Sequence, residues 1–435
     1  MNIQIIKEIS IKLNRYCLPL IFNSFLNMLF SSILFAIIGR TSVETIASVE
    51  VIDGFFYSFI GILGVSTLAF NMSVSKVEIA TRDFYDYFKS IFKLNFAIGI
   101  VAVIFSMMFS GSVLNNFYNF EGKILEIGTI YASIQSVSIL LNLVIFSMSN
   151  LMKVRKMTKT IFYTGLVASV FQIIISYFLV KIIKGDFSII AISIGSISSL
   201  LIEVIVYVYI LKDDFAHAFK IKSSKKFELF KKSIPLIFQE ILEGSIFQIL
   251  LIALISKIGY LTLSSYALTT KMTAIAMTPM YVYCNALIIF VGEYMRKNKL
   301  YHLKILPVIT ISITLIFYTL ISLLFFIFKF QTVRLFSDID EVMSFAIQIT
   351  GFILFFSSFQ IFFENTKYAL QSLGHSNSVL IITFIINCIS ITALYVLSRT
   401  YFFSIYLIVL VIDCTYLVLG IIFYAIYFKN INKTF

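Results

Sequence analysis

The chain has 435 residues, of which 60% are hydrophobic and only 13% are charged, and its formal net charge is +12. A soluble fold of this size has too little interior to bury so much apolar surface, so the composition indicates an integral membrane protein. The basic residues lie between apolar runs, which argues against a nucleic-acid partner. The four cysteines and three histidines are scattered, with no ligand spacing, so we expect no metal centre of these residues and no cofactor.

Twelve apolar segments are long enough to cross a bilayer, which takes about 20 residues as a helix. In chain order they are 16–38, 54–75, 90–112, 126–151, 161–183, 187–211, 234–256, 262–291, 305–329, 343–369, 378–397 and 404–428. Backbone exposed to lipid must satisfy its hydrogen bonds within its own segment, so we predict an all-α membrane protein. With a cytoplasmic N-terminus, 23 basic residues fall on the inner side and 8 on the outer side. This asymmetry predicts a multi-pass protein of the plasma membrane with both termini cytoplasmic.

The longest basic loop, KDDFAHAFKIKSSKKFELFKKS, begins at Lys212 and separates six spans from six. It predicts an N-terminal six-helix bundle at 1–212, a basic cytoplasmic linker at 213–233 whose lysines face anionic lipid, and a C-terminal six-helix bundle at 234–435. The two halves repeat, because PLIFNSFLN begins at Pro19 and PLIFQEILE begins at Pro235. Each half has an even number of spans, so the halves are parallel repeats related by a pseudo-two-fold axis along the membrane normal. Transporters of this design place the substrate site between their halves.

The repeated segments and several turns also carry a family resemblance. LPL…AIIGRTSVETIASV and IPL…ALISKIGYLTLSSYA begin the two halves, FSDIDEVMSFA precedes span 10, and VGEYMRKN and LQSLGHSN follow spans 8 and 10. In their order and spacing these elements resemble the multidrug and toxic compound extrusion (MATE) family of cation-coupled antiporters. The resemblance covers the whole chain. It implies two six-helix lobes that alternate between outward-open and inward-open states and export organic, usually cationic, compounds in exchange for Na+ or H+.

Two glutamates stand inside the seventh apolar segment, where an ionised carboxylate costs several kcal/mol unless it has a partner or a role. Glu243 lies about 14 Å from the inner end of span 7 at 1.5 Å per residue, and Gln360 lies at a similar depth in span 10. Glu240 and Glu364 form a shallower pair by the same arithmetic. We therefore expect these four residues to form a cation-coupling cluster, with Glu243 as the ligand if the ion is Na+.

The resemblance supports part of this cluster and departs from it elsewhere. Glu243 falls on a position that carries a cation-binding carboxylate in the family, whereas Gln360 stands where the family has Asp. An amide cannot titrate, so Glu364, one turn along, is the candidate substitute. Leu34 stands where many members carry a titratable Asp, which argues against proton coupling at that position. Asn27, which aligns with Glu243 across the repeat, is uncharged.

Other polar and aromatic residues are candidates for a substrate cavity. Lys271 in span 8 could neutralise Glu243, line a cavity for an anionic substrate, or belong to an ion pair that opens during transport. Tyr281 and Tyr283 follow a predicted helix kink in the same span, and aromatic rings bind hydrophobic cations. Asp53 near span 2 and Asn27 in span 1 complete the candidates.

Two further acids, Glu203 in span 6 and Asp413 in span 12, match no family position that carries a known role.

These features predict a secondary antiporter that exports a small amphipathic or cationic compound in exchange for Na+ or H+. Its expected partners are a small organic substrate and membrane lipid, with no nucleic acid and no obligatory protein partner. A flippase of the same superfamily, moving a lipid-linked or anionic substrate, is the alternative. An integral membrane enzyme is disfavoured, because the short outer loops hold no cluster of His, Asp, Arg and Ser. The loops also have no Walker motif, which argues against ATP-driven transport.

Overall fold

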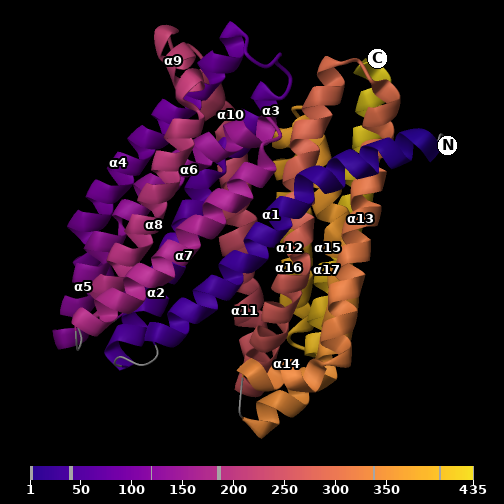
Figure 1. Ribbon diagram of the computed structural model, residues 1–435. Helices are drawn as coiled ribbons and strands as arrows, with labels where there is room; N and C mark the ends of the chain where they lie inside the picture. The colour runs from indigo at the N-terminus through magenta and orange to yellow at the C-terminus, as the bar shows by residue number, and fades with distance from the viewer. Residues whose placement is uncertain are drawn as a thin grey trace. The chain divides into compact units, whose positions relative to one another are not determined.

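The computed structural model describes residues 3–38, 43–118, 120–183, 188–336, 339–400 and 403–434. Within these ranges the regular structure is helical throughout, with no strand, so the predicted all-α class is confirmed (Figure 1). The helices of the first half are α1 (Ile3–Ile38), α2 (Val43–Gly64), α3 (Ser66–Val74), α4 (Arg82–Tyr118), α5 (Gly122–Gln135), α6 (Val137–Val154), α7 (Thr158–Ile182), α8 (Ser188–Ile210) and α9 (Lys212–Lys220).

The second half contains α10 (Lys226–Ile241), the π-helix η2 (Leu242–Phe247), α11 (Gln248–Ser256), α12 (Tyr260–Arg296), α13 (Leu300–Ile327), α14 (Lys329–Phe336), α15 (Asp340–Ser372), α16 (Ser376–Leu397) and α17 (Ile405–Thr434). Among the described residues, 11 helical stretches are long and apolar enough to cross a membrane. The first predicted span, 16–38, lies within α1. Several helices extend beyond the predicted spans by one or more turns, because polar residues at the ends of a span continue the same hydrogen-bonded ladder.

The chain divides into two compact units, Leu18–Ser233 and Ile234–Phe435, and the second unit also includes Met1–Cys17. The division therefore falls within two continuous helices, in each case just before one of the repeated prolines, Pro19 in α1 and Pro235 in α10. The start of α1 packs among the C-terminal helices. The Tyr16 ring meets Phe290 edge-on at 5.7 Å, and the Tyr283 hydroxyl donates to the side-chain oxygen of Asn14.

The basic linker is part of the unit Leu18–Ser233, the N-terminal unit, and packs against its helix α4. Lys89 of α4 donates to the carbonyl oxygens of Phe219 and Ile221, at 3.0 Å for Phe219. Asp86, one turn earlier on α4, accepts the backbone N–H of Ser224 at 2.9 Å. These contacts fix the backbone of the linker that follows α9.

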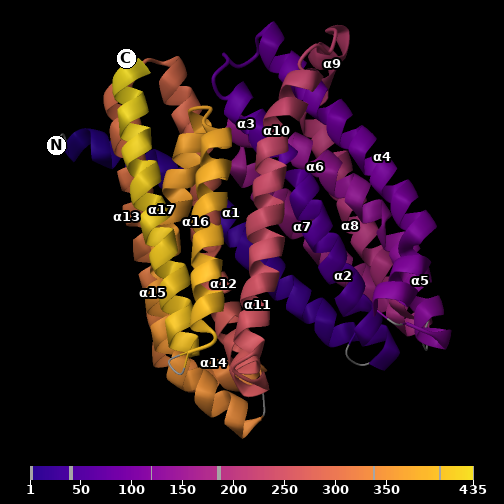
Figure 2. The same cartoon turned by 180° about the vertical axis from the view of Figure 1, so that it is seen from behind.

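In the C-terminal unit, α15 packs against both α12 and α17 along much of its length, and α16 and α17 lie side by side (Figure 2). One apolar core at this junction contains Leu254, Ile353, Leu394 and Ile408. A second contains Met277, Met280, Tyr318 and Ile361. The polar side chains described next therefore project from helices whose positions are set by this apolar packing.

Candidate functional site

Glu243 lies in a widened helical turn that the sequence did not predict. The expected span 234–256 is one continuous rod, but its ladder opens into the π-helix η2 at Leu242–Phe247. A single π turn inserted between α-helical segments is uncommon and occurs frequently at functional sites. The insertion lies between α10, which contains Pro235, and α11.

A lysine from α15 joins Glu243 to Glu364. The Lys367 ammonium lies 2.9 Å from Glu243 Oε2 and 2.7 Å from Glu364 Oε2. Its side chain and that of Glu364 are each 8% exposed, and Glu243 is 20% exposed. The three groups form a nearly buried ion cluster of two carboxyl groups and one ammonium.

Two glutamines complete the hydrogen bonding of this cluster. Gln239 donates to Glu243 Oε1 at 2.8 Å, and Gln371 donates to Gln239 Oε1 at 2.7 Å. Both amides are buried, so each would lose its partner in an apolar surrounding if the other were removed. Sequence reasoning missed Gln239, Gln371 and the role of Lys367. The available signal was the i,i+3 spacing of Lys367 after Glu364 on one helix face.

The structure therefore corrects the two expected pairs, Glu243 with Gln360 and Glu240 with Glu364. Glu243 is joined to Glu364 and not to Gln360, because the Lys367 ammonium attracts both carboxylates. Glu240 is exposed on α10, and its carboxylate lies near Gly244. It forms no ion pair with any residue that the structure describes.

Gln360 lies in a different place, a cavity of about 250 Å³ in the C-terminal unit. Tyr281 from α12 and Asp413 from α17 also line this cavity. Asp413 is 6% exposed. Asp413, to which the sequence analysis assigned no role, thus lines the same cavity as Gln360.

The N-terminal unit has a larger cavity of about 500 Å³, lined by residues from α1, α2 and α5–α8. Asp53 lines it and accepts a hydrogen bond of 2.8 Å from the Tyr131 hydroxyl. The amide side chains of Gln135, Asn142 and Gln172 also line this cavity. Among the residues that we expected in a substrate cavity, Asp53 is the one that the structure places in the largest of the described cavities.

The remaining candidates for the substrate cavity lie elsewhere. Tyr283 is fully buried and bonded to Asn14, so the structure places it in the packed core and not beside a cavity. Asn27 and Lys271 are exposed on α1 and α12 and line none of the four described cavities. Lys271 does not neutralise Glu243, whose basic partner is Lys367.

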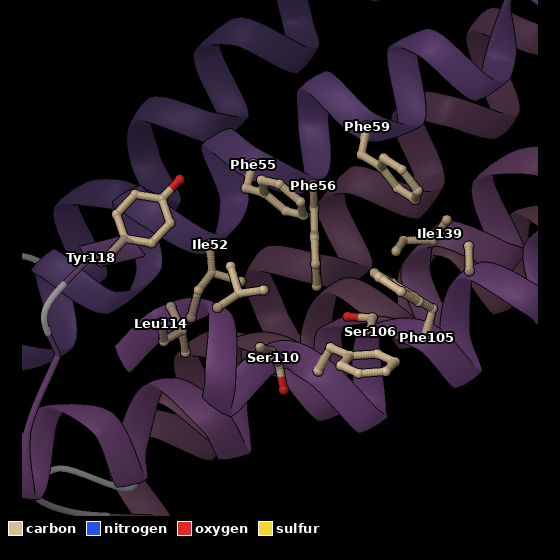
Figure 3. A pocket seen from close by; sticks show the side chains of 14 residues that line it. Ile52, Phe55, Phe56, Phe59, Phe105, Ser106, Ser110, Leu114, Tyr118 and Ile139 are labelled. Atoms are coloured by element: carbon tan, nitrogen blue, oxygen red, sulfur yellow. The ribbon is translucent and has the colours of Figure 1, made fainter. Parts of the chain in front are cut away.

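A further hollow of about 70 Å³ in the N-terminal unit is almost entirely apolar. Figure 3 shows Phe55, Phe56 and Phe59 of α2 around it, opposite Phe105 and Leu114 of α4. It contains no charged side chain and offers only apolar and hydroxyl contacts.

Comparison with known proteins identifies the second half of the chain. Residues 235–396 match the family model described as MatE. Over this segment, which is less than half of the chain, the sequence is similar to the MatE family. No curated protein matched the chain in sequence.

Solved structures extend the MATE likeness over nearly the whole chain. A multidrug resistance MATE family transporter of the MOP superfamily in an outward-facing conformation matches with a TM-score of 0.87 and 14% identity, over 98% of this chain and 96% of that one. A MOP superfamily transporter from Pyrococcus furiosus matches with a TM-score of 0.85 and 13% identity, over 98% and 96%. A variant of the Vibrio cholerae MATE transporter VcmN matches with a TM-score of 0.84 and 15% identity, over 99% and 98%.

At these identities the structural likeness shows the fold, which is the MATE fold. The MatE match over 235–396 agrees with this fold, and the many long apolar helices indicate a multi-pass membrane protein.

Proposed function

We propose that this MATE-type protein is an antiporter of the plasma membrane, with both termini cytoplasmic, that exports a small amphipathic or cationic organic compound in exchange for Na+ or H+. The observation that carries the proposal is the buried ion cluster of Glu243, Lys367 and Glu364. A charged side chain at the centre of a membrane helix costs about 2.5–3.5 kcal/mol on insertion scales, and such residues mark ion pathways. Three charged side chains in contact with one another therefore support a role in ion coupling.

The cluster suits coupling because its charges do not balance. Two carboxylates share a single ammonium, so the set retains one negative charge when all three groups are ionised. A proton or Na+ that reaches Glu243 competes directly with Lys367 for the same oxygens. If that competition differs between inward-open and outward-open states, the cation gradient shifts the population between them.

The cargo is best accommodated by the N-terminal cavity. Its volume of about 500 Å³ lies within the roughly 300–1,000 Å³ typical of pockets for drug-sized ligands. The Asp53 carboxylate supplies a negative charge, and the exposed Tyr57 ring supplies an aromatic face. A carboxylate beside an aromatic ring favours an organic cation with an apolar body.

The alternative, a flippase for a lipid-linked or anionic substrate, requires basic residues around the cargo. The charged residues that line the four described cavities are Asp53, Glu243 and Asp413, all acidic. Lys271 lines none of them. The Pyrococcus furiosus relative, whose binding pocket has a reverse polarity that suggests a different function, has the same fold, so pocket charge and not fold should separate the two functions.

The test is efflux of a fluorescent organic cation from proteoliposomes containing wild type, Glu243→Gln or Glu341→Gln. Sodium and pH gradients are imposed separately. Glu341→Gln is the matched control, because Glu341 is exposed in the first turn of α15 and lies far along that helix from Glu364.

We expect one gradient to drive efflux in wild type and in Glu341→Gln but not in Glu243→Gln. If wild type ignores both gradients, antiport is rejected and the flippase becomes the leading function. If Glu243→Gln behaves as wild type, the ion cluster is not part of the coupling mechanism.

A further inference from the structure

We propose that Asp413 is a second cation site of the C-terminal unit, which binds one monovalent positive charge, Na+ or a proton, in the cavity that it shares with Gln360. This inference rests on the proposed antiport for its role in transport, but the binding itself can be measured without transport. Nothing in the family match assigns a role to this position of α17.

Asp413 is buried in the first third of α17 without a partner among the described residues. It is 6% exposed, and it makes no hydrogen bond or ion pair with any residue in the described part of the chain. Glu243 and Glu364 have Lys367, and Asp53 has Tyr131. Buried polar groups nearly always have a partner, and one without a protein partner calls for an unseen water or ion.

Other residues that line this cavity carry oxygen atoms. Thr270 and Thr273 line the cavity, and their hydroxyls already donate to the carbonyl oxygens of Ala267 and Thr269, at 3.0 and 3.1 Å. Because the hydroxyl hydrogens are committed to the backbone, the oxygen lone pairs remain free to accept. The amide of Gln360 and the hydroxyl of Ser357 add two more oxygens. Oxygen ligands of this kind suit a hard cation.

Asp413 is the one carboxyl group among the described residues that line this cavity. The other titratable side chains on its wall are Tyr266 and Tyr281 from α12 and Tyr416 from α17, and α15 contributes none. Tyr318, on neighbouring α13, donates its hydroxyl to the Leu354 carbonyl oxygen at 2.6 Å. One carboxylate among neutral oxygens balances a monovalent cation and leaves a divalent ion undercompensated.

The size of the cavity also favours a small cation over the cargo. Its volume of about 250 Å³ lies below the roughly 300–1,000 Å³ of pockets for drug-sized ligands. It holds several waters at about 30 Å³ each, so a cation can enter with part of its hydration shell.

The neighbouring ion cluster differs from the Asp413 site in its counter-charge. Lys367 already occupies the space between Glu243 and Glu364, whereas no ammonium of a described residue lines the Asp413 cavity. The two sites are close. A hollow of about 30 Å³ beside Glu243 shares Gln248 and Tyr416 with the wall of the Asp413 cavity. A cation on Asp413 would therefore lie in a cavity adjoining the hollow beside Glu243.

The experiment measures cation binding by the thermal unfolding midpoint of the purified full-length protein in nanodiscs. Wild type, Asp413→Asn and Glu203→Gln are titrated with NaCl at constant ionic strength, with choline chloride as the balancing salt. In a second arm, pH is varied without sodium. Asp413→Asn keeps the side-chain volume, and Glu203→Gln is the matched control that removes an acid from a helix of the other unit.

We expect the wild-type midpoint to rise by several degrees in one arm and to saturate, because a ligand that binds the folded state stabilises it by mass action. Glu203→Gln should retain the response and Asp413→Asn should lose it. A response to sodium names Na+ as the ion. A response to pH alone, seen as a wild-type minus Asp413→Asn difference that changes with pH, names the proton. If neither arm distinguishes Asp413→Asn from wild type, the site is rejected.

Transport assays distinguish failure of the Asp413 site from failure of the proposed antiport. If Asp413→Asn proteoliposomes still couple efflux to the gradient with wild-type stoichiometry, the Asp413 site has no part in transport although antiport stands. If Asp413 binds a cation but wild type ignores both gradients, the site stands and antiport fails.

Discussion

Lys367 lies between two glutamates from different helices, 2.9 Å from Glu243 Oε2 in η2 and 2.7 Å from Glu364 Oε2 on its own helix. Its ammonium also lies 4.8 Å from the centre of the Phe363 ring and 5.4 Å from that of Tyr368. A lysine thus fills the position that an external cation would take between these carboxylates. Lys367 is thus the described cation that contacts both Glu243 and Glu364.

Removal of the ammonium should be strongly destabilising. Lys367→Met keeps an unbranched side chain of similar volume but removes the ammonium, so both carboxylates remain buried without their cation. Loss of one partner from a buried ion pair costs about 3–5 kcal/mol. We expect a large fall in the thermal unfolding midpoint, measured in detergent by scanning fluorimetry. Neutralisation of both acids in the triple variant with Glu243→Gln and Glu364→Gln should recover much of that loss. A midpoint equal to wild type in Lys367→Met would contradict an ionised cluster.

The hydrogen bonds that join Gln371 to Gln239 and Gln239 to Glu243 give a second prediction. Gln239→Leu removes the hydrogen bond to Glu243 and leaves the buried Gln371 amide without its acceptor. A buried group that loses its partner costs about 1–3 kcal/mol. We expect a lower unfolding midpoint and weaker ion dependence of efflux. The double variant Gln239→Leu/Gln371→Leu should be more stable than Gln239→Leu alone, because no unsatisfied amide remains. Additive losses in the double variant would show that the two amides act independently.

Asp53 should determine preference for cationic cargo. Asp53→Asn removes the charge from the N-terminal cavity but leaves an acceptor for the Tyr131 hydroxyl. A hydrogen bond or contact to a charged group contributes about 1.5–3 kcal/mol, which corresponds to about 10- to 100-fold in affinity. We expect the half-saturating concentration of an organic cation to rise by about that factor, while that of a neutral analogue changes little. Equal changes for both compounds would place the cargo elsewhere.

Close helix packing in the N-terminal unit supports a prediction about stability alone. A Cβ on Gly195 of α8 would lie 2.0 Å from Ser176 Oγ and 3.2 Å from the Gln172 carbonyl oxygen of α7. Gly195→Ala should therefore force the helices apart at a cost of about 1–3 kcal/mol. Gly61→Ala is the control, because nothing lies within 4 Å of the added Cβ and alanine favours a helix over glycine. We expect the unfolding midpoint to fall in the first variant and to hold or rise in the second.

Much of the fold could be predicted from the sequence because each membrane span can be recognised from its own apolar residues. Long apolar runs in a bilayer have to be helical, and their lengths follow from bilayer thickness. The repeat of Pro19 and Pro235 was readable for the same reason, since ungapped similarity needs no structure. The boundaries were less accurate, as in the single predicted span 234–256. There the structure has α10, η2 and α11, because a π turn depends on how a helix is packed and not on apolar content.

The candidate site shows the same division. The sequence singled out Glu243 and Glu364, because acids in apolar runs are conspicuous, but depth arithmetic assigned them the wrong neighbours. Depth along a helix gives one coordinate only, and rotation about the axis decides which side chains meet. That rotation turned Gln360 toward Asp413 and Tyr281, and it brought Lys367 to Glu243.

By itself, the sequence determined that this protein is helical, spans the membrane many times, repeats in two halves and carries rare acids within its apolar segments. Those properties follow from local hydrophobicity, backbone hydrogen bonding and spacing along the chain. Only the tertiary structure decided that Glu243 and Glu364 share Lys367 and that Asp413 has a cavity without a counter-charge. Side chains 124 residues apart, such as Glu243 and Lys367, meet through helix packing, which no local pattern encodes.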